Sequence, residues 1–109
     1  MGAANLRDIG YQFPDNSDEF LNIDSKILLR RTAELLKEKG YTIGNIDSTV
    51  AAQAPKLNPH IPAMQQTMAD VLGIDVDCVS VKATTTEKLG FEGRKEGITA
   101  YATVLIEKI

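Results

Sequence analysis

The chain has 109 residues, 43% hydrophobic and 25% charged, which is long enough for one core and predicts a single domain over residues 1–109. A net charge of −3 argues against nucleic acid as the main partner, because phosphate backbones are bound by clustered lysine and arginine. No apolar run approaches the roughly 20 residues that span a bilayer, so no membrane insertion is expected. A lone cysteine and the lack of a signal-like N-terminal run favour a cytoplasmic setting, and the small size favours oligomerisation.

The first half of the chain predicts a loop, a helix and a strand. Residues 1–23 are rich in Gly, Asp, Asn and Ser without a sustained period, which predicts a loop carrying functional groups. Asp24 or Ser25 suits the N-cap of a helix whose apolar residues recur at helical spacing until Gly40. The β-branched run 46–52 alternates with period two and predicts a strand.

The second half predicts one helix and two strands. Asn58 and Pro59 form a cap and first-turn pair before a helix that ends at Gly73. Strands are predicted over 76–84 and 98–106, with a glycine-punctuated loop between them. The strand–helix–strand order favours a parallel pair, and the last two strands are expected to pair antiparallel. The predicted fold class is α/β (α+β), a mixed β-sheet with helices packed on a face.

Polar groups at predicted strand ends are the candidate functional residues. The threonines of residues 84–86 can hold phosphate oxygens and Glu87 can hold Mg²⁺, although a β-branched strand end gives the same pattern. Lys56 is either a phosphate-binding charge or a solvated lysine. Asp8 either accepts hydrogen bonds from sugar-like hydroxyls or caps a turn.

Other reactive residue types have ordinary structural interpretations. His60 is interpreted as a packing or capping residue and Cys78 as a small core residue. One histidine and one cysteine do not supply the three protein ligands that a catalytic zinc usually has. The glycines of the 89–97 segment do not match the dinucleotide fingerprint G-x-G-x-x-G, so a dinucleotide fold is not expected.

Taken together, several segments make the chain resemble the 2-C-methyl-D-erythritol 2,4-cyclodiphosphate synthase family along its whole length. These segments are Gly2-Ala3-Ala4, Asp8-Ile9-Gly10, Phe13-Pro14-Asp15, Ala52-Gln53-Ala54-Pro55-Lys56 and the run Lys82 to Phe91. The resemblance implies the homotrimer-forming fold of that family. It also implies a phosphorus–oxygen lyase of non-mevalonate isoprenoid synthesis, which cyclises 4-diphosphocytidyl-2-C-methyl-D-erythritol 2-phosphate and releases CMP.

The resemblance also implies roles for individual residues. Thr85 would stabilise the transition state and Glu87 would take Mg²⁺ or Mn²⁺. Phe91 and Arg94 resemble residues of the central trimer cavity, where an isoprenoid diphosphate sits in some members. Substrate binding is implied for the following residues: Asp8, Ile9, Gly10, Phe13, Pro14, Asp15, Asn16, Ser17, Ala52, Gln53, Ala54, Pro55, Lys56, Leu57, Asn58, Thr84, Thr86, Glu87, Phe91 and Arg94.

The resemblance implies Zn²⁺ as a second cofactor and active sites between neighbouring subunits of a homotrimer. The family's zinc ligands and its catalytic His-Ser pair are expected upstream of Met1, so the sequence is expected to be incomplete. The implied ligand is a small-molecule, nucleotide-linked substrate. The alternative is a non-catalytic, oligomerising domain that binds cytidine or isoprenoid diphosphates.

Overall fold

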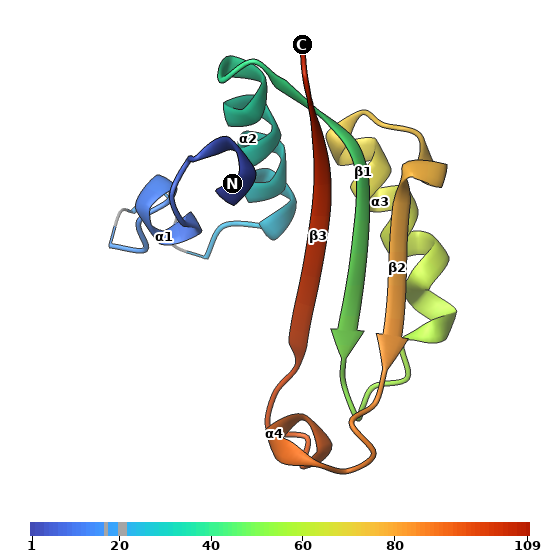
Figure 1. Cartoon of the computed structure of the whole chain (residues 1–109). Coiled ribbons are helices and arrows are strands. Elements are labelled where there is room, and N and C mark those ends of the chain that lie inside the picture. The colour runs from blue at the N-terminus through green and yellow to red at the C-terminus, as the bar shows by residue number, and fades with distance from the viewer. Residues whose placement is uncertain (17, 20–21) are drawn as a thin grey trace. The chain divides into compact units, whose positions relative to one another are not determined.

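The computed structural model describes residues 1–16, 18–19 and 22–109, and their arrangement along the chain is shown in Figure 1. By internal contacts the chain divides into two compact units, residues 1–44 with 106–109 and residues 45–105. No helix in the described part of the chain is both long and apolar enough to cross a membrane.

The first unit contains the helix that the apolar spacing predicts. Helix α2 (Ser25–Glu38) begins after Asp24, whose Oδ1 accepts a hydrogen bond from the Lys26 amide at 2.9 Å. This hydrogen bond, assisted by the Lys26 ammonium group, lowers the pKa of the Asp24 carboxyl. Gly40, with φ of 95°, follows the helix in a conformation that glycine adopts without steric cost. The predicted helix is therefore confirmed, together with its start.

The segment before α2 has more structure than the loop that its composition predicts. It forms a 3-10 turn, η1 (Gly2–Ala4), and one helical turn, α1 (Ile9–Gln12). The Gln12 side-chain amide donates to the Leu6 carbonyl at 2.6 Å, which ties the end of α1 to the preceding residues. A single turn stabilised by such a bond is too short to produce a detectable hydrophobic period.

In the described part of the chain, three strands form a sheet in the order β2-β1-β3. They are β1 (Tyr41–Ala51), β2 (Val79–Thr84) and β3 (Thr99–Lys108). Strands β1 and β2 are parallel, with a register that runs from Ile46 opposite Val79 to Ala51 opposite Thr84. Strand β3 runs in the opposite direction, so the sheet is mixed, as predicted (Figure 1).

The expectation that the last two strands pair with each other is wrong, because β1 lies between β2 and β3. The helical crossover places β2 along one edge of β1 and leaves the other edge of β1 open. The connection from residue 85 to residue 98 is long enough to cross beneath one strand, since neighbouring strands are only about 4.8 Å apart. The last strand therefore pairs with the first.

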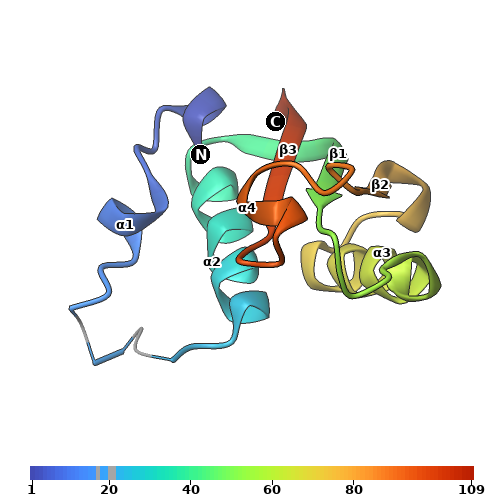
Figure 2. The same ribbon diagram turned by 90° about the horizontal axis from the view of Figure 1, so that it is seen from below.

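Helix α3 (Ile61–Leu72) covers β2 and forms the best-packed part of the second unit (Figure 2). Ala69 and Val79 are each 2% exposed, Val81 is also buried, and half-buried apolar residues surround them. The 3-10 turn η2 (Asn58–His60) precedes α3, and η3 (Val76–Cys78) connects it to β2. His60 is the exposed N-cap of α3 without a capping side-chain hydrogen bond, and Cys78 is half-buried.

Candidate functional site

The parallel pairing of β1 and β2 places two candidate segments next to each other. Parallel strands end at the same edge of a sheet, and the last paired residues here are Ala51 and Thr84. The pairing continues for one more hydrogen bond, from the Ala52 amide to the Thr84 carbonyl at 2.9 Å. Residues 52–58 and 84–88 therefore leave the sheet side by side.

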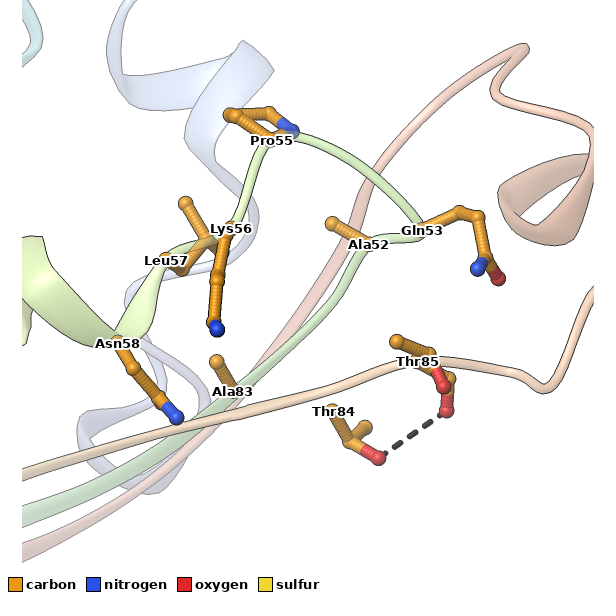
Figure 3. A pocket seen from close by; sticks show the side chains of 9 residues that line it. All are labelled: Ala52, Gln53, Pro55, Lys56, Leu57, Asn58, Ala83, Thr84 and Thr85. Atoms are coloured by element: carbon orange, nitrogen blue, oxygen red, sulfur yellow. Dashed lines mark hydrogen bonds between the residues drawn. The ribbon is translucent and has the colours of Figure 1, made fainter.

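These two segments line a pocket of about 380 Å³, which is within the range of small-molecule sites (Figure 3). Lys56 and Asn58 extend from one wall toward the strand that carries Ala83 and Thr84. No acidic residue lines the pocket among the residues described, so the Lys56 ammonium group gives it a positive charge. The lining residues are Ala52, Gln53, Pro55, Lys56, Leu57, Asn58, Ala83, Thr84 and Thr85.

A tight, hydroxyl-rich turn follows β2 at the edge of this pocket. Thr85 Oγ1 lies 3.3 Å from both the Glu87 amide nitrogen and Glu87 Oε1, and Thr86 Oγ1 donates to the Leu89 carbonyl at 2.5 Å. Glu87 and Lys88 have φ values of 53° and 66°. A left-handed conformation at a residue other than glycine costs about 1–2 kcal/mol, so surrounding contacts must hold this turn.

Two contacts from outside the turn meet at Lys88. Its amide donates to Gln53 Oε1 at 3.2 Å, across 35 residues of sequence. Helix α4 (Gly90–Gly93) brings Gly93 so close that a Cβ built there would lie 2.2 Å from the Lys88 carbonyl carbon. Helix α4 is in turn linked to β3, because Thr99 Oγ1 donates to Glu92 Oε2 at 2.9 Å. No pattern in the sequence indicated either contact at Lys88.

A second pocket, of about 340 Å³, lies in the first unit. Its lining includes four of the residues implied to bind substrate, namely Ile9, Gly10, Phe13 and Asp15, together with Leu28 of α2. Leu28 was not anticipated as a site residue, because its spacing with the other apolar residues of α2 gives only a core interpretation. Asp8 directly precedes α1, and its Oδ2 would lie 3.4 Å from a Cβ at Gly10.

Several other implied residues lie outside both pocket linings. Arg94 forms an ion pair with Glu96 at 2.7 Å, and Phe91 is 45% exposed on α4 beside Gly97. Ser17 lies outside the described residues. The remaining residues that line neither pocket are Asp8, Pro14, Asn16, Ala54, Thr86 and Glu87.

The donor groups fit Mg²⁺ and do not fit zinc. Magnesium is usually held by one or two carboxylates together with substrate phosphates, and the exposed Glu87 offers one carboxylate beside threonine hydroxyls. Catalytic zinc requires about three protein ligands, and residues 1–16, 18–19 and 22–109 contain no cluster of three His, Cys, Asp or Glu side chains placed to hold a metal.

Comparison with known proteins gives consistent matches over the whole chain. The YgbB family matches residues 1–107. A 2-C-methyl-D-erythritol 2,4-cyclodiphosphate synthase of Bacteroides fragilis is 67% identical over 109 residues, which are 100% of this chain and 69% of that relative.

Solved structures of related proteins also have the same fold. The bifunctional IspDF from Campylobacter jejuni matches with a TM-score of 0.94 and 44% identity, over 99% of this chain and 29% of that one. A CDP complex of IspF from Plasmodium falciparum matches with a TM-score of 0.80 and 38% identity, over 94% of this chain and 60% of that one.

Proposed function

Because the chain belongs to the YgbB family of 2-C-methyl-D-erythritol 2,4-cyclodiphosphate synthases, we propose that it binds the cytidine diphosphate part of the synthase substrate in the pocket of residues 52–58 and 83–85. The relatives confirm the predicted family, fold class and lyase-type function, and they favour this function over the non-catalytic alternative. The residues of this chain then have to bind a nucleotide and place two phosphate groups for reaction.

The observation that carries the proposal is the position of Lys56 and the threonine hydroxyls around one pocket (Figure 3). The Plasmodium falciparum relative is a CDP complex, so this family includes a protein that holds that nucleotide. A pocket of about 380 Å³ with one ammonium group and two hydroxyls suits a nucleotide carrying a charged diphosphate. We assign Lys56 to a phosphate of the departing CMP and the Ala52–Asn58 loop to the cytidine.

The proposed reaction is a phosphoryl transfer that needs no covalent protein intermediate. An oxygen of the substrate's 2-phosphate attacks the β-phosphorus of its diphosphate, and the bond from that phosphorus to CMP breaks. The protein has to hold the two phosphates in line and neutralise charge. Glu87 would hold Mg²⁺, which supplies positive charge at the phosphate oxygens when bound.

Thr85 is suited to act on the β-phosphate. Its Oγ1 lies 3.3 Å from Glu87 Oε1, which is a long separation for a bond between these groups. The Thr85 hydroxyl would donate its proton in a hydrogen bond to an oxygen of the transferring phosphoryl group, and the Glu87 carboxylate would remain free to hold the cation. A donor aimed at charge that develops during the reaction lowers the barrier more than it strengthens ground-state binding.

The pocket of the first unit is assigned to the methylerythritol end of the substrate. Asp15 lines it with Gly10, and a carboxylate accepts hydrogen bonds from sugar-like hydroxyls. Asp8, Pro14 and Asn16 flank this lining in sequence.

Assembly into a homotrimer, with active sites between subunits, is supported by β3. This strand forms one edge of the sheet and exposes Tyr101 and Leu105 by 64% and 57%. An exposed apolar edge strand is usually covered by another chain or element, and most oligomers are formed by copies of one chain. In such a trimer Phe91 and Arg94 are assigned to the central cavity. The single domain, the cytoplasmic setting and the zinc site stay predictions.

The proposed function is tested by measuring CMP release from 4-diphosphocytidyl-2-C-methyl-D-erythritol 2-phosphate, with protein expressed from its whole reading frame. Lys56→Met should raise the Kd for CDP by about tenfold or more, because it removes a charge-assisted contact. Lys37→Met removes the same charge from the last turn of α2, outside both pocket linings, and should leave CDP binding unchanged. Absence of CMP release, or equal CDP affinity in Lys56→Met, would contradict the assignment.

A further inference from the structure

The two segments that line the CDP pocket are connected by the Gln53 side chain. Gln53 lies in the loop after β1, and its Oε1 accepts a hydrogen bond from the Lys88 amide, in the turn after β2. A backbone amide only donates, so the oxygen end of the Gln53 amide group must face it. In Figure 3 the Gln53 side chain extends away from Lys56 and Asn58 rather than toward them.

The turn that receives this contact is held internally by two hydrogen bonds between Thr86 and Leu89, at 2.5 and 3.0 Å, but depends on contacts from other segments for its position. Glu87 and Lys88 are exposed and both adopt left-handed conformations, and the separations between Thr85 and Glu87 are 3.3 Å. Within the described part of the chain, Gln53 provides the one side-chain hydrogen bond that reaches residues 84–88 from another segment. Close packing of Gly93 against the Lys88 backbone is the second restraint.

We propose that Gln53 is a positioning residue, which fixes the turn bearing Thr85 and Glu87 relative to the nucleotide loop through the Lys88 amide. This replaces the nucleotide-wrapping role that the resemblance implies for its side chain. The inference rests on the proposed function only for the chemistry that the turn performs. Loss of the contact should misplace Thr85 and Glu87. It should therefore lower kcat and leave the affinity for the nucleotide largely unchanged.

The contact itself can be tested without measuring catalysis, by hydrogen exchange at the Lys88 amide in the free protein. Gln53→Met has a side chain of similar length without a strong acceptor, and should speed exchange at this amide by about five- to tenfold. Gln53→Glu keeps an oxygen acceptor at the same reach and should keep the protection within about twofold. Gln66→Met, on α3, removes an amide that donates a hydrogen bond to Asp70, and it should leave the Lys88 amide unaffected.

Catalysis then separates positioning from binding. Gln53→Met should lower kcat by about the same factor as it speeds exchange, with the Kd for CDP within about twofold of the original protein. Gln53→Ala serves as a second acceptor-free variant if methionine disturbs folding.

The inference is overturned if Lys88 exchange is unchanged in both acceptor-free variants, or if CDP affinity falls more than kcat. If the original protein releases no CMP, the proposed function fails, while the exchange comparison between the methionine and glutamate variants still decides whether Gln53 holds the turn.

Discussion

Replacing Gly93 by alanine should destabilise the protein, although alanine normally favours helices. The new Cβ would lie 2.2 Å from the Lys88 carbonyl carbon, 2.6 Å from its Cα and 2.7 Å from its oxygen. Carbon atoms in contact prefer about 3.5–4.0 Å, so α4 or the Lys88 backbone has to move by more than about 1 Å. The obstructing atoms belong to the backbone and cannot rotate away.

The expected magnitude is the difference between two opposing effects. Overpacking of this kind costs about 1–3 kcal/mol, while exchanging glycine for alanine in a helix gains up to about 1 kcal/mol. A single helical turn realises only part of that gain, so we expect a net loss of about 1–2 kcal/mol. For a domain of this size each kcal/mol corresponds to a fall of about 4–8 °C in Tm.

Thermal unfolding at one fixed protein concentration measures this effect. Gly2→Ala is the matched control, because a Cβ there meets no atom within 4 Å. The rate of CMP release by the Gly93 variant should also fall by more than its lower stability explains, because Lys88 belongs to the same turn as Thr85 and Glu87. A Gly93→Ala protein with unchanged or raised Tm and full activity would refute the close approach of α4 to Lys88.

Three further predictions concern single side chains. Thr85→Ala should lower kcat by about a hundredfold and change KM little, because a donor to developing charge acts in the transition state. Steady-state measurement of CMP release tests this, and a raised KM with equal kcat would show that Thr85 only binds substrate. Glu87→Gln should leave the circular dichroism spectrum unchanged and raise the Mg²⁺ concentration needed for half-maximal activity, because an amide is a poorer ligand for a hard cation than a carboxylate. An unchanged Mg²⁺ requirement would assign Glu87 a structural role. Asp24→Ala should reduce the loss of stability on acidification. The folded-state pKa of Asp24 is lowered, so its contribution to stability is complete above the unfolded pKa and disappears as pH falls below about 4. Urea titrations of both proteins across that pH range would contradict this if the free energy of unfolding decreased equally with pH in the two.

The helices were predictable because their signals are local. Asp24 begins α2 and Gly73 ends α3 as their residue types indicate, and the apolar residues between such caps recur at helical spacing. Strand β1 begins at Tyr41 rather than Ile46, since Gly44 interrupts the alternation on which the prediction depends. The place of β3 beside β1 depends on which sheet edge remains open, and no short sequence window carries that information.

The candidate site also has parts that could be predicted from the sequence and parts that could not. The segments around Lys56 and Thr85 were predicted from the chain's resemblance to its family, and they line one pocket together. The contact between Gln53 and Lys88 spans 35 residues, and neither residue type indicates it. The left-handed backbone conformation of Glu87 could not be predicted either, because non-glycine residues adopt it only where tertiary contacts impose it.

The parallel register of β1 and β2 limits where this chain can gain or lose residues. A deletion within either strand would slide one loop past the other by about 3.3 Å and turn every following side chain to the opposite face. The Ala52 and Thr84 ends would then no longer meet, and the pocket of residues 52–58 and 83–85 would lose one wall. An insertion between Gly73 and Cys78, before β2 begins, leaves the pairing unchanged, so length variation is expected there rather than in the strands.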